Sequence, residues 1–354
     1  MSNEIKNYFV QGAILIDVDG ASLNNLGVDN SIADKNKILT KSIKKGKATY
    51  AFISGQAWRY WWRESCAING WSLSPITKEG DIYVTKADPI NHKDDDIFGY
   101  MRAPNKQNTF TRKSPLKNSI LVSVSPVTLV NEFSIMNRQQ NSIEDANPMP
   151  YGSESYSAIM KGMFSIDLDQ VGTFTSMNRS GYQNISATTK EELLNDDTNK
   201  VVTDLIDKNI ERVRLSDKKR IERVSEVIKA LKTISGGAKL TTNYNSVKPD
   251  FIILAIFKGG NNPFDNIAID ENGNSKLSED AIKDAIVDNI EYLRSDVYIG
   301  RKKGFMDEFD PGKITQGADT ITAKDKSITI HFGSINQIID KFTDENIEKI
   351  IKEM

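Results

Sequence analysis

The stretch ISGQAWRYWWRES, residues 53–65, holds three of the four tryptophans in the chain, interleaved with two arginines. Ser54 is a typical N-cap residue, so the pattern predicts a helix that begins directly after it. On a helical wheel, Trp61 and Trp62 fall within about 60° to either side of Trp58. The tryptophans therefore form one stripe, which we expect to be buried and to anchor the helix against a sheet.

The same helix has a second, polar face. Arg59 and Arg63 are four residues apart and therefore lie side by side, with Gln56 next to them. These side chains belong to the first turns of the helix, where the N-terminus already favours anions. A glutamine and two arginines at such a position suit a phosphate backbone. The alternative is a core helix that carries two surface arginines.

Length and composition narrow the possible classes of protein. The 354 residues, of which 38% are hydrophobic, suffice for one elaborated domain or two. We expect a cytoplasmic protein without a membrane span, because no apolar run is long enough and the N-terminus lacks the features of a signal peptide. The single cysteine excludes an internal disulfide, and the two distant histidines argue against a metal centre or a serine-type triad. We therefore expect no metal and no cofactor.

The charge is unevenly distributed along the chain. The net charge of −2 argues by itself against nucleic-acid binding, which needs a positive surface. However, six lysines and one acid lie between Asp34 and Lys47, and five basic residues without an acid lie between Arg102 and Lys117. The segment 265–296 is mostly acidic. The pattern predicts separate basic and acidic surfaces, with solvated loops as the alternative.

Strands and helices alternate in an irregular order. Strand patterns occur in YFVQGAILIDVDG (8–20), ILVSVSPVTLV (120–130) and KPDFIILAIFKGG (248–260), and the last is apolar enough for a central strand. Residues 137–157 are polar and connect two strands, which predicts a long protruding hairpin. Helical spacing predicts helices over 200–215 and 217–234. These elements favour a mixed α+β fold with insertions.

Several segments together resemble a known family. They are ASLNNLGVDN (21–30), a lysine-rich loop, ISGQAWRYWWRE (53–64), DDDIFGYM (94–101), ILVSVSPVTLV, YGSESYSAIMKGMFSIDL (151–168) and ISGGAKLTTNYNSVKPDFIILAIFKGGNNPF (234–264). In this order they resemble the backbone subunit of type I CRISPR interference complexes (Cascade). The resemblance is greatest to the type I-B branch, the DevR-like family, and spans roughly residues 8–264.

The resemblance implies a three-part architecture. The palm would have a modified RNA-recognition-motif (ferredoxin-like) fold, carrying a finger-like insertion and a thumb hairpin. The expected parts are a first palm segment with an RNA-facing helix (1–67), the finger (68–116), a palm strand (117–136), the thumb (137–157) and the rest of the palm with C-terminal helices (158–354). The aromatic pair with which single RNA-recognition motifs stack bases is not evident in YFVQGAILIDVDG.

The resemblance also implies a function. Several copies would bind one CRISPR RNA along its phosphate backbone and form a filament that presents guide bases to target DNA in antiviral defence. The implied partners are further copies of the chain, a large subunit, a subunit that caps the 5′ end of the guide and the endoribonuclease that processes the guide. The family leaves cleavage to a separate subunit, so we expect no enzymatic activity.

The resemblance assigns RNA contacts to individual positions. Asn24 would lie near the guide, Lys41, Lys44 and Lys45 in the loop before the helix, and Ser54, Gln56, Arg59 and Arg63 on the helix itself. Met136, Asn137, Arg138, Met149 and Tyr151 belong to the thumb region, and Gly236, Gly237 and Lys239 to a further loop beside the RNA. As alternatives, Met149 and Tyr151 pack within the hairpin and the glycines only end a helix.

Two other functions compete with this interpretation. The first is a metal-dependent ribonuclease that acts on target RNA, for which Asp17, Asp19 and the run Asp94–Asp96 are the available carboxylates. The ordinary interpretation of such a run is a solvated turn. The second is an RNA-free scaffold protein, in which the tryptophan cluster and the charged segments serve only contacts between subunits.

Overall fold

One large sheet organises the molecule. The computed structural model describes residues 5–28, 37–105, 108–136, 149–178, 183–204 and 207–354. Its main path of strands is β21 (Thr320–Ala323), β22 (Lys326–Gly333), β20 (Val297–Arg301), β17 (Phe251–Lys258), β1 (Tyr8–Ala21), β13 (Met149–Asp167), β11 (Leu121–Ser123), β5 (Ala48–Ile53) and β4 (Ser42–Lys45). The sheet is mixed, because β20 and β22 are parallel whereas β1 is antiparallel to both of its neighbours.

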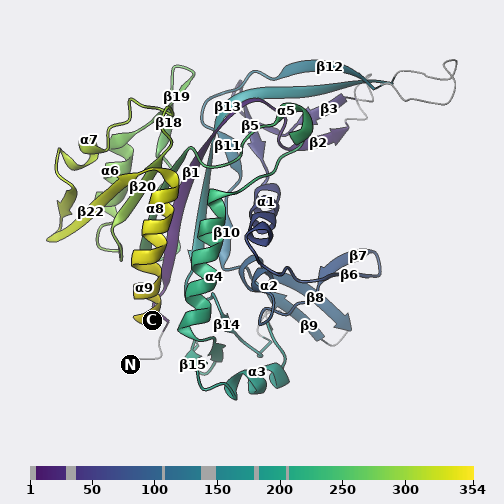
Figure 1. The fold of residues 1–354 in the computed structure, drawn as a ribbon, viewed down its shortest axis with the longest axis vertical. Helices are drawn as coiled ribbons and strands as arrows, with labels where there is room; N and C mark the ends of the chain where they lie inside the picture. The colour runs from purple at the N-terminus through teal and green to yellow at the C-terminus, as the bar shows by residue number, and fades with distance from the viewer. Residues whose placement is uncertain (1–4, 29–36, 106–107, 137–148, 179–182, 205–206) are drawn as a thin grey trace.

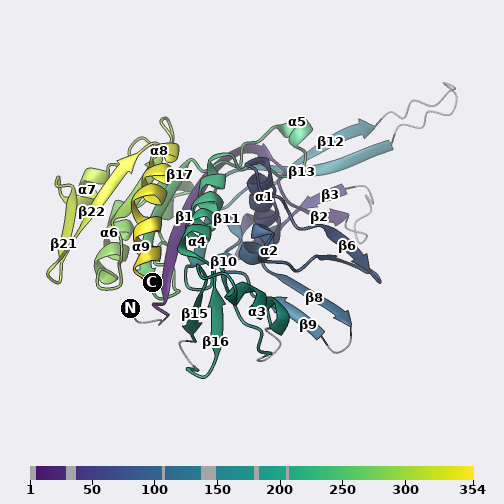
Figure 2. The ribbon, with the colours of Figure 1, turned by 60° about the horizontal axis from the view of Figure 1, so that its bottom comes forward.

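The centre of this sheet is buried on both faces. β17 is buried at every position before Lys258, which confirms the central strand predicted from its continuous apolar run. Helices α1 (Gly55–Ile68), α4 (Asp217–Lys229) and α8 (Ile335–Phe342) pack on one face, as Figures 1 and 2 show. Helix α6 (Glu279–Asp288) and the short α7 (Pro311–Thr315) contribute to a second core on the other face. The result is a mixed α+β protein dominated by one sheet.

The segment 68–116 forms a lobe of short elements beside α1. It contains β6 (Ile76–Glu79), β7 (Ile82–Thr85), α2 (Lys93–Phe98), β8 (Tyr100–Asn105), β9 (Asn108–Arg112) and β10 (Leu116–Asn118). β6 pairs with β7 and β8 with β9, and these two hairpins project from the body in Figure 2. β10 returns to the large sheet by pairing with β13. We call residues 68–116 the finger lobe.

A long hairpin leaves the large sheet at its upper edge in Figure 1. β12 (Val130–Met136) pairs antiparallel with the first part of β13, from Met136 opposite Met149 to Val130 opposite Ser155. The predicted hairpin is therefore present, and residues 137–148 lie outside the described residues. β13 continues without a break into the large sheet as far as Asp167. The boundary predicted after residue 157 thus falls inside one continuous strand.

The helix predicted over 200–215 is wrong. The chain forms β15 (Lys200–Thr203) and β16 (Glu211–Arg214) there, and together with β14 (Thr173–Phe174) they make a three-stranded sheet. Val213 and Phe174 are buried in a small separate core against α3 (Ala187–Leu194). The β-branched valines suit a strand as well as a helix, and here β15 and β16 pair with each other while β14 pairs with β16. The helix predicted over 217–234 is present as α4 and the 3-10 turn Ala230–Lys232.

The remaining elements are short. β2 (Asn25–Val28) and β3 (Lys37–Thr40) form a hairpin whose second strand also pairs with β13, and α5 (Leu240–Asn243) is a single helical turn. β18 (Ala268–Glu271) pairs with β19 (Asn274–Leu277), and α9 (Glu348–Lys352) ends the chain. Among the helices of the described residues, none combines the length and the apolar character needed to cross a membrane.

Candidate nucleic-acid interface

The start of α1 is held in place by Asn24. The Oδ1 atom of Asn24 accepts a hydrogen bond from the amide of Ser54 at 2.9 Å, and its carbonyl accepts one from the amide of Lys41 at 3.1 Å. Ser54 caps the helix as predicted, since its Oγ accepts from the amide of Ala57 at 3.2 Å. Asn24, Lys41 and Ser54, three of the predicted RNA-binding positions, are thereby brought together at one helix N-terminus.

The tryptophan stripe is buried, as predicted. Trp58 and Trp62 are fully buried and stack with 5.8 Å between their ring centroids. The Nε1 atom of Trp62 donates to the carbonyl of Val227 on α4 at 2.7 Å, so α1 is locked to its neighbour as well as to the sheet. Cys66 lies beneath the same face, and burial raises the pKa of its thiol. These residues anchor α1, and they are not available for contact with a ligand.

Arg59 is half-buried and its guanidinium is engaged within the protein, so the alternative of a surface arginine does not hold for it. Its Nη1 atom donates to the carbonyl of Leu116 at 2.8 Å and to Oδ1 of Asn118 at 3.1 Å. Its Nη2 atom donates to the carbonyl of Phe98 at 2.9 Å and also to Ser114. Burial lowers the pKa of Arg59 to about 10. The guanidinium therefore joins α1 to the finger lobe.

Arg63 faces the same way and is also engaged. Its Nε and Nη2 atoms both reach Oδ2 of Asp94, at 3.0 Å and 2.5 Å, and only 17% of its side chain is exposed. The exposed face of α1 instead carries Gln56, Tyr60 and Ile68. Helical spacing placed both arginines on the polar face of α1, and it could not reveal their partners, which are far away in sequence. RNA contact by either arginine stays a prediction.

The acidic run of α2 is an internal charge cluster. Asp94, Asp95 and Asp96 are all buried, so the solvated turn suggested by their sequence is wrong. Asp94 accepts from Arg63 and from the amide of Ser74, and Asp95 accepts from the amide of Asp88 at 2.8 Å. Asp94 and Asp96 are thus engaged by groups of the protein, whereas Oδ1 of Asp95 is buried without a hydrogen-bond partner.

The glycine pair after α4 allows a close approach to α1 and to the segment after β1. A Cβ atom on Gly236 would lie 2.2 Å from the ring of Trp61, and one on Gly237, at φ +109°, would lie 2.5 Å from Leu23. The next residue, Ala238, donates its amide to the carbonyl of Leu23 at 3.0 Å. Tight packing explains the glycines more fully than a simple helix stop does.

Lys239 links this loop to the root of the hairpin. Its ammonium group contacts the hydroxyl of Ser153 and lies 5.9 Å from the ring centre of Tyr151. Tyr151 is half-buried on β13. Met136 and Met149 form the last described pair of the hairpin, but only their backbone is described, and Asn137 and Arg138 lie outside the described residues.

Lys44 and Lys45 lie apart from this cluster. Both are exposed on β4, the last strand on one side of the large sheet's main path, and the Lys45 ammonium lies 5.0 Å from the ring centre of Tyr50. They add positive charge to the sheet edge next to β5, the strand that leads into α1. Their contact with RNA stays a prediction.

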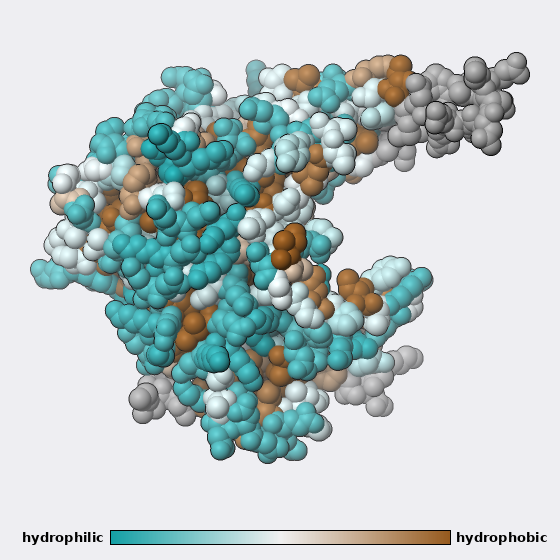
Figure 3. Space-filling model, in the orientation of Figure 1, coloured by the Kyte–Doolittle hydropathy of each residue, from teal (hydrophilic) through white to brown (hydrophobic). Residues whose placement is uncertain are grey.

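The molecule is deeply hollowed on one side. Figure 3 shows a wide concavity between the hairpin above and the finger lobe below, and in the same view of Figure 1 α1 stands between these two projections. The root of the hairpin, with Tyr151 and Lys239, lies at the upper end of this face. We call this surface the concave face.

Sequence reasoning missed Tyr60, which is 58% exposed on the side of α1 opposite its packed face.

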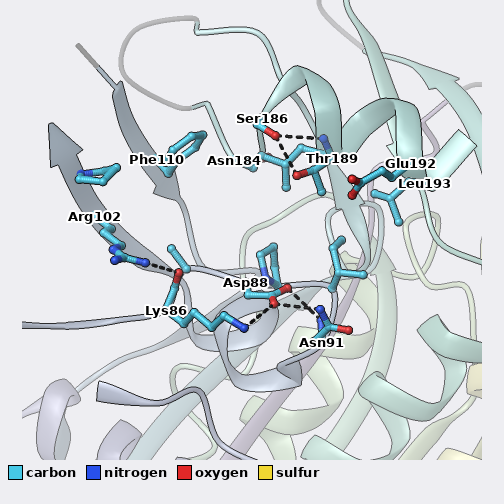
Figure 4. A pocket seen from close by; sticks show the side chains of 15 residues that line it. Lys86, Asp88, Asn91, Arg102, Phe110, Asn184, Ser186, Thr189, Glu192 and Leu193 are labelled. Carbon is cyan, nitrogen blue, oxygen red and sulfur yellow. Dashed lines mark hydrogen bonds and ion pairs between the residues drawn. The ribbon is translucent and has the colours of Figure 1, made fainter. Parts of the chain in front are cut away.

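A separate cavity of about 500 Å³ lies between the finger lobe and α3. Figure 4 shows its lining, with Phe110 and Arg102 on one side and Thr189 and Leu193 of α3 on the other. Arg102 is paired with Glu79. None of the predicted RNA-binding residues lines this cavity.

The carboxylates suggested for a ribonuclease do not gather into a metal site. Asp17 and Asp19 lie on β1, whereas Asp94–Asp96 lie on α2. Burial and the neighbouring charges of Asp19 and Asp250 raise the pKa of Asp17. Within the part of the chain that the structure describes, no group of three or more acidic, histidine or cysteine side chains is placed to hold a metal ion.

Comparison with known proteins places the chain in a family. A family model described as CRISPR-associated negative auto-regulator DevR/Csa2 matches residues 18–274. The chain belongs to the DevR/Csa2 family. This confirms the resemblance found in the sequence at the level of the family, and the type I-B branch remains a proposal. No curated protein matches the chain in sequence.

Solved structures share the fold of this DevR/Csa2 member. A chain described as "CRISPR RNA-guided surveillance complex" is 9% identical, with a TM-score of 0.51. A second, described as "CRISPR RNA-guided surveillance complex, pre-nicking", is 11% identical with a TM-score of 0.54. Each alignment covers 95% of this chain and 99% of the other. At such identities the similarity shows a common fold, and it extends over nearly the whole length of both chains.

Proposed function

We propose that this DevR/Csa2 member is a non-catalytic backbone subunit of a type I-B CRISPR interference complex, and that it binds CRISPR RNA along the concave face. The observation that carries the proposal is that three predicted elements contact one another at the upper end of the concave face. They are the capped N-terminus of α1, the Gly236–Lys239 loop and the root of the hairpin. The palm would correspond to the RNA-recognition-motif-like sheet and the finger lobe to the finger.

The start of α1 suits a phosphate group. The first amides of a helix have no partner within the helix, and here Gly55 and Gln56 precede the capped amide of Ala57. Gln56 is exposed beside them. Lys41 and Lys239 supply positive charge near the helix start, and Lys44 and Lys45 add charge farther away, on the sheet edge. Because such contacts reach phosphate and sugar, they bind a guide of any sequence and leave its bases to pair with target DNA.

The remaining parts of the function follow from several copies on one RNA. The hairpin would separate guide bases at regular intervals, and adjacent copies would dock acidic surfaces against basic ones. The complex would include the large subunit, the 5′-end-capping subunit and the endoribonuclease that processes the guide, in the cytoplasm. The buried state of Asp94–Asp96 favours a subunit that does not itself cleave RNA.

Co-expression with a repeat–spacer transcript tests the proposal. The chain is purified with and without the transcript, washed with high salt or treated with ribonuclease, and measured by the ratio of absorbance at 260 nm and 280 nm. We expect bound RNA, and regular filaments in electron micrographs that disappear after ribonuclease treatment. A protein that stays free of RNA at moderate salt, or that forms the same assemblies without RNA, would favour the scaffold function instead.

A further inference from the structure

Tyr244 is the most exposed large hydrophobic or aromatic side chain of the described residues. Its side chain is 90% exposed, whereas the next in order, Ile68, is 74% exposed. A single exposed aromatic ring is common on protein surfaces, and what distinguishes Tyr244 is how its backbone is held and what surrounds the ring. It follows α5 in the loop that begins with Lys239, and the predicted RNA-binding set did not include it.

The backbone around Tyr244 is held in an unfavourable conformation. Lys239 and Tyr244 flank the single turn of α5, and both are left-handed, with φ of +56° and +49°. Residues other than glycine adopt this region at a cost, and they keep it only when the surroundings impose it. Here two hydrogen bonds hold the backbone on either side of Tyr244 in place.

Two asparagines on either side of Tyr244 supply these bonds. Asn243 donates its side-chain amide to the carbonyl of Gly20 at 2.8 Å, and Asn245 donates its own to the carbonyl of Asp19 at 2.6 Å. Both acceptors belong to the end of β1. The residues before and after Tyr244 are thus fastened to the central sheet, while the tyrosine ring between them is directed into solvent. The ring is thus presented by a loop that is hydrogen-bonded to β1.

The surroundings of the ring suit a nucleotide. Tyr244 borders a cavity of about 540 Å³, whose other walls include Leu240, the hydroxyl side chains of Thr233 and Ser235, and Lys248. None of the residues that line it carries a negative charge. An aromatic ring, several hydroxyl groups and a lysine match a base with its sugar and phosphate, whereas the centre of a protein interface is mostly apolar.

The position of the loop connects Tyr244 to the proposed RNA path. Figures 1 and 2 both show α5 at the root of the hairpin formed by β12 and β13, beyond the N-terminal end of α1. Lys239, at the other end of the same helical turn, contacts Ser153 and lies over the ring of Tyr151. Tyr244 therefore lies about one helical turn from a residue of the proposed interface.

We infer that Tyr244 is a stacking platform for a base of the bound guide RNA, positioned by Asn243 and Asn245. The inference rests on the proposed function, because it assumes that RNA follows the concave face as far as the root of the hairpin. A tyrosine suits this role, since stacking on a ring tolerates any base and therefore leaves the guide sequence free to vary.

The test compares the affinity of full-length variants for a labelled repeat–spacer RNA, measured by fluorescence anisotropy at several salt concentrations. Tyr244→Ala is expected to weaken binding about 5- to 150-fold, the range for the loss of one stacked base. Tyr244→Phe keeps the ring and is expected to stay within about twofold of the unchanged protein. The slope of affinity against salt should be the same in all three, since no charge is removed.

Tyr292→Ala is the matched control, because Tyr292 is also exposed, at 53%, but follows α6 on the opposite face of the sheet. It should bind as the unchanged protein does. Equal affinity of Tyr244→Ala and the unchanged protein would overturn the inference and leave the proposed function intact. So would a Tyr244→Ala variant that binds RNA normally but loses RNA-free self-association, since the ring would then serve a protein contact. If the unchanged protein fails to bind RNA, the proposed function itself is overturned, and this inference with it.

Discussion

Arg223 on α4 and Asp96 on α2 form a buried ion pair, with 2.5 Å between Nη1 and Oδ2, although 127 residues separate them. Asp96 also pairs with Arg112 on β9 and accepts from the amide of Gly172 at 2.9 Å. One carboxylate therefore holds the finger lobe, the three-stranded sheet region and a helix of the main sheet together.

Replacing this carboxylate should destabilise the protein strongly. Asp96→Asn keeps the size of the side chain but leaves two buried guanidinium groups without their counter-charge, which typically costs about 3–5 kcal/mol. We expect the midpoint of urea unfolding to fall accordingly, measured by tryptophan fluorescence. Asp270→Asn, at an exposed position on β18, is the control and should change stability by less than about 0.5 kcal/mol. A loss as small as that for Asp96→Asn would contradict the structural role.

Variants of Arg59 and of the two edge lysines should affect different properties, the former the stability of the protein and the latter its affinity for RNA. Arg59→Ala removes hydrogen bonds that join α1 to the finger lobe, and we expect it to lower the free energy of unfolding by about 2–4 kcal/mol. Lys44→Ala combined with Lys45→Ala removes only exposed charge. This double change should leave stability nearly unchanged and reduce the slope of log affinity against log salt by about 1.4. If Arg59→Ala lowers the slope instead, its guanidinium reaches a phosphate.

A single methyl group should disturb the contact between the glycine loop and α1. In Gly236→Ala the added Cβ would meet the Trp61 ring, so either the ring or the loop must move, at a typical cost of about 1–3 kcal/mol. Gly333→Ala is the matched control, because its Cβ would come no closer than 3.5 Å to Gln337 and Ile338, an ordinary van der Waals contact. The measurement is the unfolding midpoint of each variant. Equal midpoints would show that the loop yields without cost.

The protein should not cleave RNA. Incubation with complementary RNA and Mg²⁺ or Mn²⁺ is expected to leave the RNA intact, because the acidic run is buried and Asp94 and Asp96 are engaged by other groups of the protein. Cleavage is followed on denaturing gels with a guide-bound preparation. Metal-dependent cuts at fixed intervals that disappear in Asp95→Ala would establish the ribonuclease function in place of the one proposed.

Periodic features could be predicted from the sequence, and contacts between distant segments could not. The tryptophan stripe, the central strand β17 and the hairpin each rest on a pattern within one segment, and each is present. Helical spacing put Arg63 on the polar face of α1 but gave no sign of its partner Asp94, which lies 31 residues away. A helix over 200–215 was predicted because valine spacing fits both helix and strand, whereas the chain pairs β15 with β16 and adds β14 beside them.

The candidate site shows the same division. Family resemblance selected Asn24, Ser54 and Lys239, and the structure brings the segments that carry them together through a few hydrogen bonds. Tyr244 was missed because one aromatic residue in a loop gives no periodic signal. Its only trace in the sequence is the pair of asparagines that flank it, and their meaning depends on the carbonyls at the end of β1.

The continuity of β13 limits how this fold can vary in length. The strand belongs to the hairpin at Met149 and to the large sheet at Asp167, and side chains along it alternate between two faces. Inserting one residue between Ser155 and Met160 would move every side chain on one side of the insertion to the opposite face of the strand. Either core residues of the large sheet would become exposed, or the two faces of the hairpin would be interchanged. Insertions there are tolerable only in pairs or as bulges. Among relatives, we expect the hairpin to vary in length beyond Met136 and Met149. In the part of β13 that follows Met149, we expect length differences of an even number of residues, so that each side chain keeps its face.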